Sequence, residues 1–249
     1  MSTASGADCL RANAWICGEY VRDRADELTD ATLEHIVIAA TAVGIALVVS
    51  FPLALLARRG RLAAGGILGL TTVLYTVPSL AMYALLLPFF GISASVVVCG
   101  LVLYSLTVLV RNTLEGLRAV PEEAREAARG LGYGRTRLLL TVELPLALPA
   151  IVAGVRIAAV SAVSLTTVGA IVGHGGLGDL IYSGMDSYFK AQVLTASVLC
   201  VLLAVAADLL LLLVQRLLTP WTRAGRRRGR RGPAAPDTPT ATATTAGTV

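Results

Sequence analysis

The residues that most often carry out chemistry are few in this sequence, and they do not form a recognisable constellation. The two histidines, His35 and His174, lie far apart and lack a cysteine partner in a metal-ligand spacing. No nucleophile stands beside a base, and no G-x-x-x-x-G-K-[ST] loop is present to hold a nucleotide. We therefore predict no catalytic residue, no metal site and no cofactor, which disfavours a membrane enzyme. Any ATP hydrolysis would come from a partner subunit.

Charge, glycine and proline instead gather in one segment, Glu122–Pro149, in the middle of an apolar chain. Pro121 and the glutamates that follow it suit the first turn of a helix, where the helix dipole favours carboxylates. The expected helix has one narrow apolar face, formed by Ala124, Ala127, Ala128 and Leu131, and two ion pairs, Glu122–Arg125 and Glu126–Arg129.

This expected helix is followed by Gly130, Gly132 and Gly134, which predict a sharp turn of the backbone. Beyond the turn, Pro145 and Pro149 mark the start of the next membrane helix. A small-residue helix face followed by a glycine turn lets another protein approach closely. The segment therefore predicts a docking site rather than an ordinary loop.

Membrane-spanning helices must position this segment. Leu62–Val110 is a run of 49 residues without one charged side chain, whereas about 20 residues cross a bilayer core. This run therefore holds two spans, with a turn at Pro88–Ser93. A soluble helical protein is disfavoured, and six spans are possible only if Gly65–Pro88 hides a re-entrant piece. Three further spans, which make five in an all-α membrane protein, are expected at His35–Ala57, Leu146–Val172 and Ala191–Leu213.

The distribution of arginine predicts the orientation of these spans. Arginines cluster at 58–61, 111–137 and 223–231, whereas the N-terminal segment is acidic. The positive-inside rule then places the N-terminus outside, the C-terminus in the cytoplasm and the loop Val172–Lys190 outside a bacterial cell membrane. The basic cluster at 223–231 directly follows a span, so membrane lipids rather than nucleic acid are its expected partner.

The four cysteines divide between the spans and the expected outer surface. Cys99 and Cys200 lie inside spans and behave as small apolar residues. Cys9 and Cys17 lie on the outer side, where a disulfide is chemically allowed. We do not predict one, because a mobile segment would not hold the two thiols together.

A few polar or helix-breaking residues interrupt the spans. Arg156 and Asp208 are charged residues within spans, and such groups usually face the interior of a bundle or lie near an interface. An ion pair between Arg156 and Asp208 is a hypothesis that no sequence pattern supports. Pro78 and Ser79 predict a kink beside a translocation path, with a kink that serves only packing as the alternative.

The charged segment resembles the "EAA" loop of ABC importer permeases. Glu126-Ala127-Ala128, Gly132, Val142 and Leu144-Pro145 occur at the family's spacing, with Val142 as the one departure, where isoleucine is usual. In that family the loop is a coupling helix that docks onto a cytoplasmic ATPase. The resemblance therefore implies a type I importer permease fold. The residues expected to couple to the ATPase are Glu126, Ala127, Ala128, Gly132, Leu144 and Pro145.

Within this family the chain is similar to permeases for osmoprotectants such as glycine betaine, carnitine and choline. The likeness extends over about residues 33–217 and includes "LYTVPSLAMYALLLPFFGI" and "GAIVGHGGLGDLI". His174 departs from it, because a small residue is more usual there. A permease for another small solute, such as an amino acid, is the alternative. An ion-coupled secondary transporter is disfavoured, because repeats and several acidic residues at membrane depth are not seen.

The resemblance also implies partners and a domain plan. A quaternary ammonium is usually held in an aromatic cage, yet both tryptophans lie outside the spans. The cage is therefore expected in an extracytoplasmic substrate-binding protein, beside a cytoplasmic ATP-binding subunit and a second permease copy or paralogue. We expect an outer segment at 1–32, a permease domain at 33–217 with its coupling loop at 112–145, and a basic, then disordered, cytoplasmic tail at 218–249. The residues expected in the translocation path are Pro78, Ser79 and Arg156.

Overall fold

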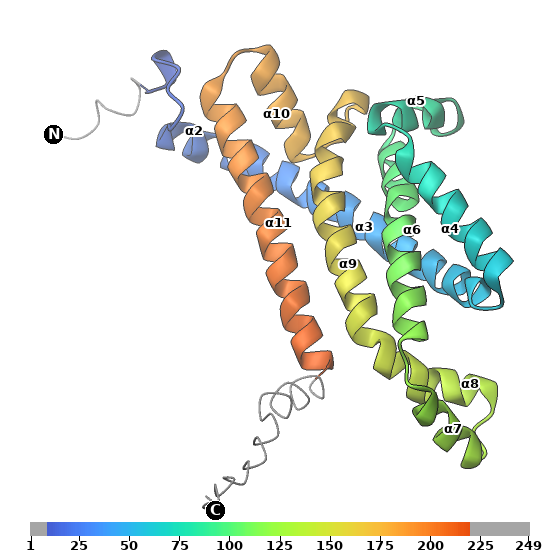
Figure 1. Ribbon diagram of the computed structural model, residues 1–249. Helices are drawn as coiled ribbons and strands as arrows, with labels where there is room; N and C mark the ends of the chain where they lie inside the picture. Colours follow the sequence, from blue (N-terminus) through green and yellow to red (C-terminus); the bar gives the residue numbers. More distant parts are fainter. Residues whose placement is uncertain (1–8, 220–249) are drawn as a thin grey trace, which may run out of the picture.

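The computed structural model describes residues 9–219, and the expected disordered tail lies almost entirely outside this part of the chain. The helices α6, α9 and α11 stand side by side and α3 crosses them obliquely, with α7 and α8 at one end of the bundle and α2, α5 and α10 at the other (Figure 1). The elements are α2 (Gly18–Asp23), α3 (Ala25–Ala57), α4 (Arg61–Thr76), α5 (Ser79–Phe90), α6 (Ala94–Arg118), α7 (Glu122–Gly130), α8 (Arg135–Leu138), the π-helix η1 (Leu139–Glu143), α9 (Leu144–Thr166), the 3-10 helix η2 (Thr167–Val172), α10 (Leu177–Asp186) and α11 (Lys190–Leu218).

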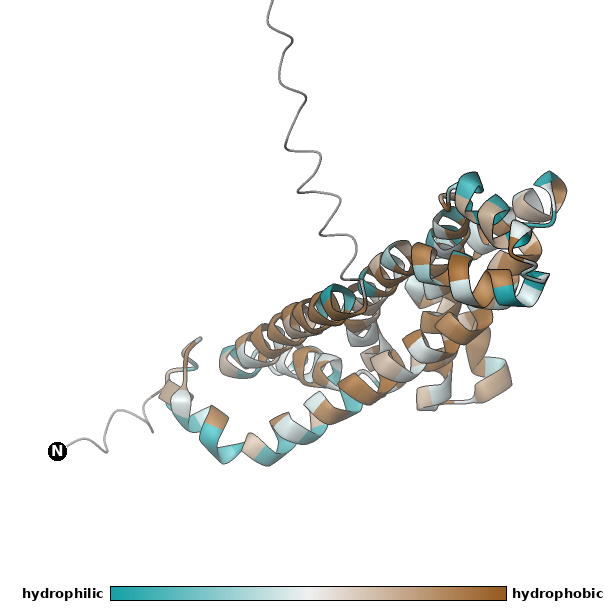
Figure 2. Ribbon diagram, turned by 90° about the horizontal axis from the view of Figure 1, so that it is seen from below, coloured by the Kyte–Doolittle hydropathy of each residue, from teal (hydrophilic) through white to brown (hydrophobic). Residues whose placement is uncertain are grey.

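Four helical segments are long and apolar enough to cross a membrane, namely α3, α6, the run Arg135–Val172 and α11. The pair α4 and α5 makes a fifth if its two helices count as one broken span. The prediction of about five spans in an all-α membrane protein is therefore confirmed. Figure 2 shows the apolar character of α11 along most of its length, in contrast to α2 and the beginning of α3, which are hydrophilic.

The predicted kink at Pro78 is a sharp break, with α4 and α5 inclined by 100°. Pro78 has no N–H, so it cannot continue the hydrogen bonding of α4. The Val77 N–H instead donates to the Leu74 carbonyl, and the Tyr104 hydroxyl donates to the Val77 carbonyl. The Pro78 carbonyl then begins α5 by accepting from Met82. The break thus leaves the Val77 carbonyl paired at membrane depth, as an apolar environment requires.

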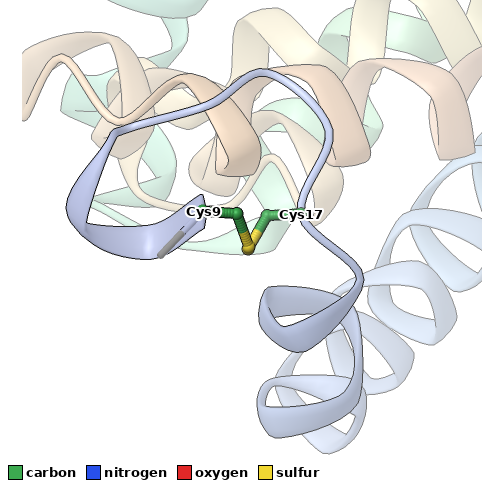
Figure 3. Close-up of a disulfide and its surroundings, with 2 residues drawn as sticks. All are labelled: Cys9 and Cys17. Atoms are coloured by element: carbon green, nitrogen blue, oxygen red, sulfur yellow. A yellow bond between two sulfur atoms is a disulfide. The ribbon is translucent and has the colours of Figure 1, made fainter. Parts of the chain in front are cut away.

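Two expectations about the end of the bundle that carries α2 and α10 are wrong. The stretch Val172–Lys190, expected as a loop, contains the helix α10, which packs against η2 and α11. The N-terminal segment is not mobile from Cys9 onward: Cys9 and Cys17 form a disulfide (Figure 3), and Cys17 and Tyr20 join a buried cluster with α10 and α11. The apolar faces of these short elements bury one another, which sequence periodicity over so few residues did not reveal.

The two histidines make structural contacts near the same end of the bundle. His35 is fully buried in α3, and its ring nitrogens lie 2.9 Å from the Val163 carbonyl and 3.1 Å from the Gly175 carbonyl. It therefore joins α3 to α9 and to the turn before α10. His174 lies 3.7 Å from Glu34 across the same junction.

Small residues allow α6 and α9 to approach closely at the centre of the bundle. A Cβ atom on Gly154 of α9 would lie 2.6 Å from the Asn112 Cβ of α6, and one on Gly116 would lie 2.9 Å from the Ala150 Cβ. Within a membrane, helices associate mainly by such close packing, because lipid tails are as apolar as the side chains they contact.

We predict that Gly154→Ala destabilises the protein by about 1–3 kcal/mol, because the new methyl group overpacks the contact with Asn112. Gly44→Ala is the matched control, since a Cβ atom there meets nothing within 4 Å. Thermal unfolding in detergent measures both. Equal transition temperatures for the two variants would contradict the close packing of α6 against α9.

Candidate functional site

The charged segment forms the helix α7 as predicted, but its apolar face is divided. Pro121 precedes the helix as its N-cap rather than occupying the first helical position. Ala128 is buried against its own chain, whereas Ala127 is exposed and Leu131 is 76% exposed. The helix therefore packs against the rest of the protein through Ala128, whereas Ala127 and Leu131 remain accessible to another surface.

Gly132 is the residue that ends α7. Its φ angle is +81°, in the left-handed region that favours glycine. The Gly132 N–H donates to the Arg129 carbonyl and the Tyr133 N–H donates to the Ala128 carbonyl, at 2.9 and 3.0 Å. This pair of bonds is a Schellman motif, which satisfies carbonyls at a helix C-terminus. Gly130 and Gly134 do not adopt this left-handed conformation, because neither has a positive φ.

The Glu143 carboxylate is buried at the base of α9 and is held by two arginines. Arg58, at the end of α3, donates two hydrogen bonds to it, at 2.7 and 2.8 Å. Arg125 of α7 places its Nε atom 3.0 Å from Glu143 Oε1. The Glu143 side chain is 6% exposed and that of Arg125 is 14% exposed. The carboxylate thus joins α3, α7 and the start of α9 through charge-assisted contacts in a water-poor site.

Arg125 extends this ionic cluster to a fourth element. Its guanidinium donates to the Leu117 carbonyl at the end of α6, at 2.6 Å, and to Glu122 at 2.9 Å. Glu122 also accepts from Arg129 at 2.9 Å. The Arg125 and Arg129 hydrogen bonds lower the pKa of Glu122, so its charge persists as the pH falls toward its ordinary range.

The two ion pairs predicted within α7 have different outcomes. The Glu122–Arg125 pair is confirmed. The Glu126–Arg129 pair is wrong, because Arg129 turns back one more turn to Glu122 and leaves Glu126 exposed. Glu122 lies beside both guanidinium groups, so its carboxylate accepts hydrogen bonds from Arg125 and from Arg129.

Leu144 and Pro145 lie where the helical run enters the membrane. Leu144 packs in a cluster with Leu117 and Ala147, and Pro145 is the second residue of α9. The π-helix η1 directly precedes them. Because Pro145 donates no hydrogen bond, the wider turn before it lets the helix continue from α8 into α9 without a sharp kink.

The structure separates the residues predicted for a translocation path, because Arg156 lies apart from the adjacent pair Pro78 and Ser79. Ser79 lies in a pocket between α5, η2 and α10, with Tyr182 and Met185 on its far side. Arg156 lies lower, in a second pocket on α9 and α11. Its guanidinium donates to both carboxylate oxygens of Asp208 at 2.9 Å, which confirms the guessed pair. Pro78 forms the break before Ser79 and lines neither pocket.

The fold can be compared with solved structures. A subunit of the MetNI methionine ABC transporter matches 79% of this chain and 98% of its own, with a TM-score of 0.72 and 21% sequence identity. A chain of an amino acid ABC transporter crystallised with histidines gives a TM-score of 0.68 at 17% identity. The protein therefore has the fold of a type I ABC importer permease, as the resemblance implied.

Sequence comparison gives the family. Residues 37–224 match the family described as "Binding-protein-dependent transport system inner membrane component". The osmoprotectant import permease protein OsmW of Salmonella typhimurium is 37% identical over 206 residues, which is 81% of this chain and 96% of the relative. The choline transport system permease protein OpuBB of Bacillus subtilis is 33% identical over 81% of this chain and 93% of its own. The chain belongs to this family and is a multi-pass membrane protein.

Glu143 and Arg58 belong to the site but were not among the residues predicted for it. Glu143 is a lone carboxylate between apolar residues at the start of a span, which is a signal that it needs a buried partner. In the sequence, Arg58 contributes only to the arginine cluster that predicts the orientation of the spans. The distance of 85 residues between them hides the pair from any local pattern.

We predict that Glu143→Gln destabilises the protein by about 3–5 kcal/mol, because it leaves Arg58 without a carboxylate partner and removes one of the two carboxylates beside Arg125 in a mostly buried site. Arg129→Gln should cost at most about 1 kcal/mol, because the Arg129–Glu122 pair is exposed. Thermal unfolding of the purified protein compares them. A Glu143 variant as stable as the Arg129 variant would refute the structural role of the cluster.

Proposed function

We propose that this chain is the translocation subunit of an ABC importer for glycine betaine, choline or carnitine-type osmoprotectants. The observation that carries the proposal is the combination of the α7 loop with relatives named as osmoprotectant and choline permeases over most of the chain. Import of an amino acid is the second candidate, because the solved structures with this fold include methionine and amino acid transporters. Their lower sequence identity makes the osmoprotectant assignment the stronger one.

We propose that α7 docks onto a cytoplasmic ATP-binding subunit. Ala127, Leu131 and Glu126 form its outward surface, while Gly132 sets the turn that presents them. Ala128 and Arg125 hold the helix to its own chain. A displacement of α7 would therefore be transmitted through the ionic cluster around Glu143 to α3, α6 and α9. Leu144 and Pro145 lie at the start of α9 and receive that displacement.

The remaining partners follow from the family and from topology. We propose that the N-terminus lies outside and α11 ends in the cytoplasm, beside membrane lipids. The Cys9–Cys17 disulfide supports an outer location, because disulfides persist in oxidising compartments. An extracytoplasmic binding protein would deliver the solute, and a second permease copy or paralogue would complete the path.

We propose that the path follows one face of α9, from Ser79 at the outer end to Arg156. Residues 157, 161 and 164 on this face are exposed, and two of them are serines. The Arg156 and Asp208 side chains remain 27% and 36% exposed at membrane depth. Facing lipid, such a charge costs about 2.5–3.5 kcal/mol by insertion scales. Water in a path, or the second permease chain, removes that cost.

The coupling role can be tested with a matched pair of glycine variants. Proteoliposomes containing the complete transporter should take up radiolabelled glycine betaine or choline only with ATP. Gly132→Ala should reduce uptake about tenfold, because alanine resists the left-handed turn that presents α7. Gly130→Ala should transport normally, because Gly130 lies within α7 and meets nothing within 4 Å. Wild-type protein that carries neither solute would reject the osmoprotectant assignment and leave an amino acid as the candidate to test.

The path can be tested by thiol accessibility in protein with Cys99 and Cys200 changed to alanine. Ser161→Cys should react with a membrane-impermeant cationic thiol reagent in the assembled transporter, and substrate should slow the reaction. Leu202→Cys, 57% exposed on α11 outside the proposed path, should stay unreactive in lipid. The path is misplaced if Leu202→Cys reacts as fast as Ser161→Cys.

A further inference from the structure

A pocket of about 440 Å³ lies where the end of α3 meets α7, α8 and η1. Three arginines line it, one from the end of α3, one from α7 and one from α8, and the Glu143 carboxylate lies among them. The full lining, which we call the arginine pocket, consists of Arg58, Arg129, Arg135, Leu138, Leu139 and Glu143. The arginine pocket therefore combines guanidinium groups with an apolar wall.

The arginine pocket carries a net positive charge. Its lining holds three arginines against the one carboxylate of Glu143, a balance of +2. The groups directly behind the lining leave this balance unchanged, because Arg125 adds one positive charge and Glu122 one negative charge. The wider surroundings are also basic, since the stretches 58–61 and 118–143 together contain eight arginines and four glutamates. Neighbouring carboxylates therefore do not neutralise the pocket.

Arg135 is the arginine of this pocket that the chain itself leaves unpaired. Arg58 donates to Glu143, and Arg129 donates to Glu122. Within residues 9–219, Arg135 forms no hydrogen bond or ion pair, and the residue is exposed. Three guanidinium groups around one pocket repel one another, and an anion between them would turn this repulsion into attraction. A guanidinium is planar and matches two oxygens of a phosphate at once.

From this charge and geometry we propose that the arginine pocket binds a phosphate group. The bound phosphate would accept hydrogen bonds from the ends of α3, α7 and α8 and so link three elements that meet at the ionic cluster around Glu143. The inference goes beyond the proposed function, because it does not depend on which solute is carried.

The apolar surroundings favour the phosphate of a membrane lipid as the source. Leu138 and Leu139 form one wall of the arginine pocket. Leu140 and Leu146, farther along the same helical run, are 54% and 42% exposed. Lipid acyl chains would lie along these leucines while the headgroup enters the pocket, as basic pockets beside membrane helices bind anionic headgroups. A phosphate compound dissolved in water is the other source of the same chemistry.

A carboxylate of the proposed ATP-binding subunit is a competing occupant, and the position of Arg129 argues against it. Arg129 is two residues from both Ala127 and Leu131, and residues at this spacing lie on different faces of a helix. The arginine pocket is therefore on the other side of α7 from the surface that we propose for docking of the ATP-binding subunit.

The first experiment measures thermal unfolding of the full chain in nanodiscs of phosphatidylcholine, with and without an equal part of phosphatidylglycerol. The wild-type transition temperature should be higher with phosphatidylglycerol, because a ligand of the folded state stabilises it. Arg135→Gln should lose at least half of this rise. Arg137→Gln should keep it, because this matched variant removes the same charge from the same helix, whereas Arg137 lies over the Tyr133 ring and outside the pocket. Equal losses would indicate attraction to the basic surface in general and overturn the proposal.

The second experiment separates the two sources of phosphate. Native mass spectrometry should show about tenfold weaker binding of phosphatidylglycerol to Arg135→Gln than to wild type. If inorganic phosphate instead raises the transition temperature in an Arg135-dependent way, and phosphatidylglycerol does not, the proposed site stands with a soluble ligand. The absence of an Arg135-dependent effect with both probes overturns the proposal. Weaker assembly of Arg135→Gln with the ATP-binding subunit, together with that absence, would assign the pocket to a carboxylate of the subunit.

Discussion

The buried Glu143 carboxylate is the interaction on which the arrangement of the α7 end of the bundle depends. It draws the end of α3 and the helix α7 toward the base of α9, through Arg58 and Arg125. Removing a charge of this kind from water is costly unless hydrogen bonds replace the solvent, and here both carboxylate oxygens accept from arginine. The α7 loop is therefore attached by ionic contacts of fixed geometry, which hold it in one orientation relative to α3 and α9.

At the centre of the bundle, contacts of another kind take over. Gly116 and Gly154 let α6 and α9 approach closely, because each glycine packs against a side chain of the opposite helix. At the opposite end, around α2 and α10, short elements bury one another, and a disulfide closes the N-terminal loop. The molecule is thus stabilised by ionic contacts at one end, close helix packing in the middle, and a small apolar core with a disulfide at the other.

The sequence predicted much of this arrangement, and its failures have physical reasons. The uncharged run 62–110 and Pro78 predicted two spans and the break in the first, because charge and proline act locally. The turn at Gly132 was predicted for the same reason. Glu143 and Arg58 were missed, because their pairing depends on the tertiary fold. The helix α10 was read as a loop, because glycines precede it and its apolar face is only ten residues long.

The continuous helical run Arg135–Val172 has a mechanical consequence. It is a rod of 38 residues whose lower end carries the π-turn beside the ionic cluster and whose upper end borders the Ser79 pocket. The 23 residues of α9 alone span about 35 Å at 1.5 Å per residue. A π-turn has looser backbone geometry than the α-helix around it, and so offers a pivot at the base of the rod. A tilt of a few degrees there would move the far tip by ångströms, which makes α9 a lever joining the two membrane surfaces.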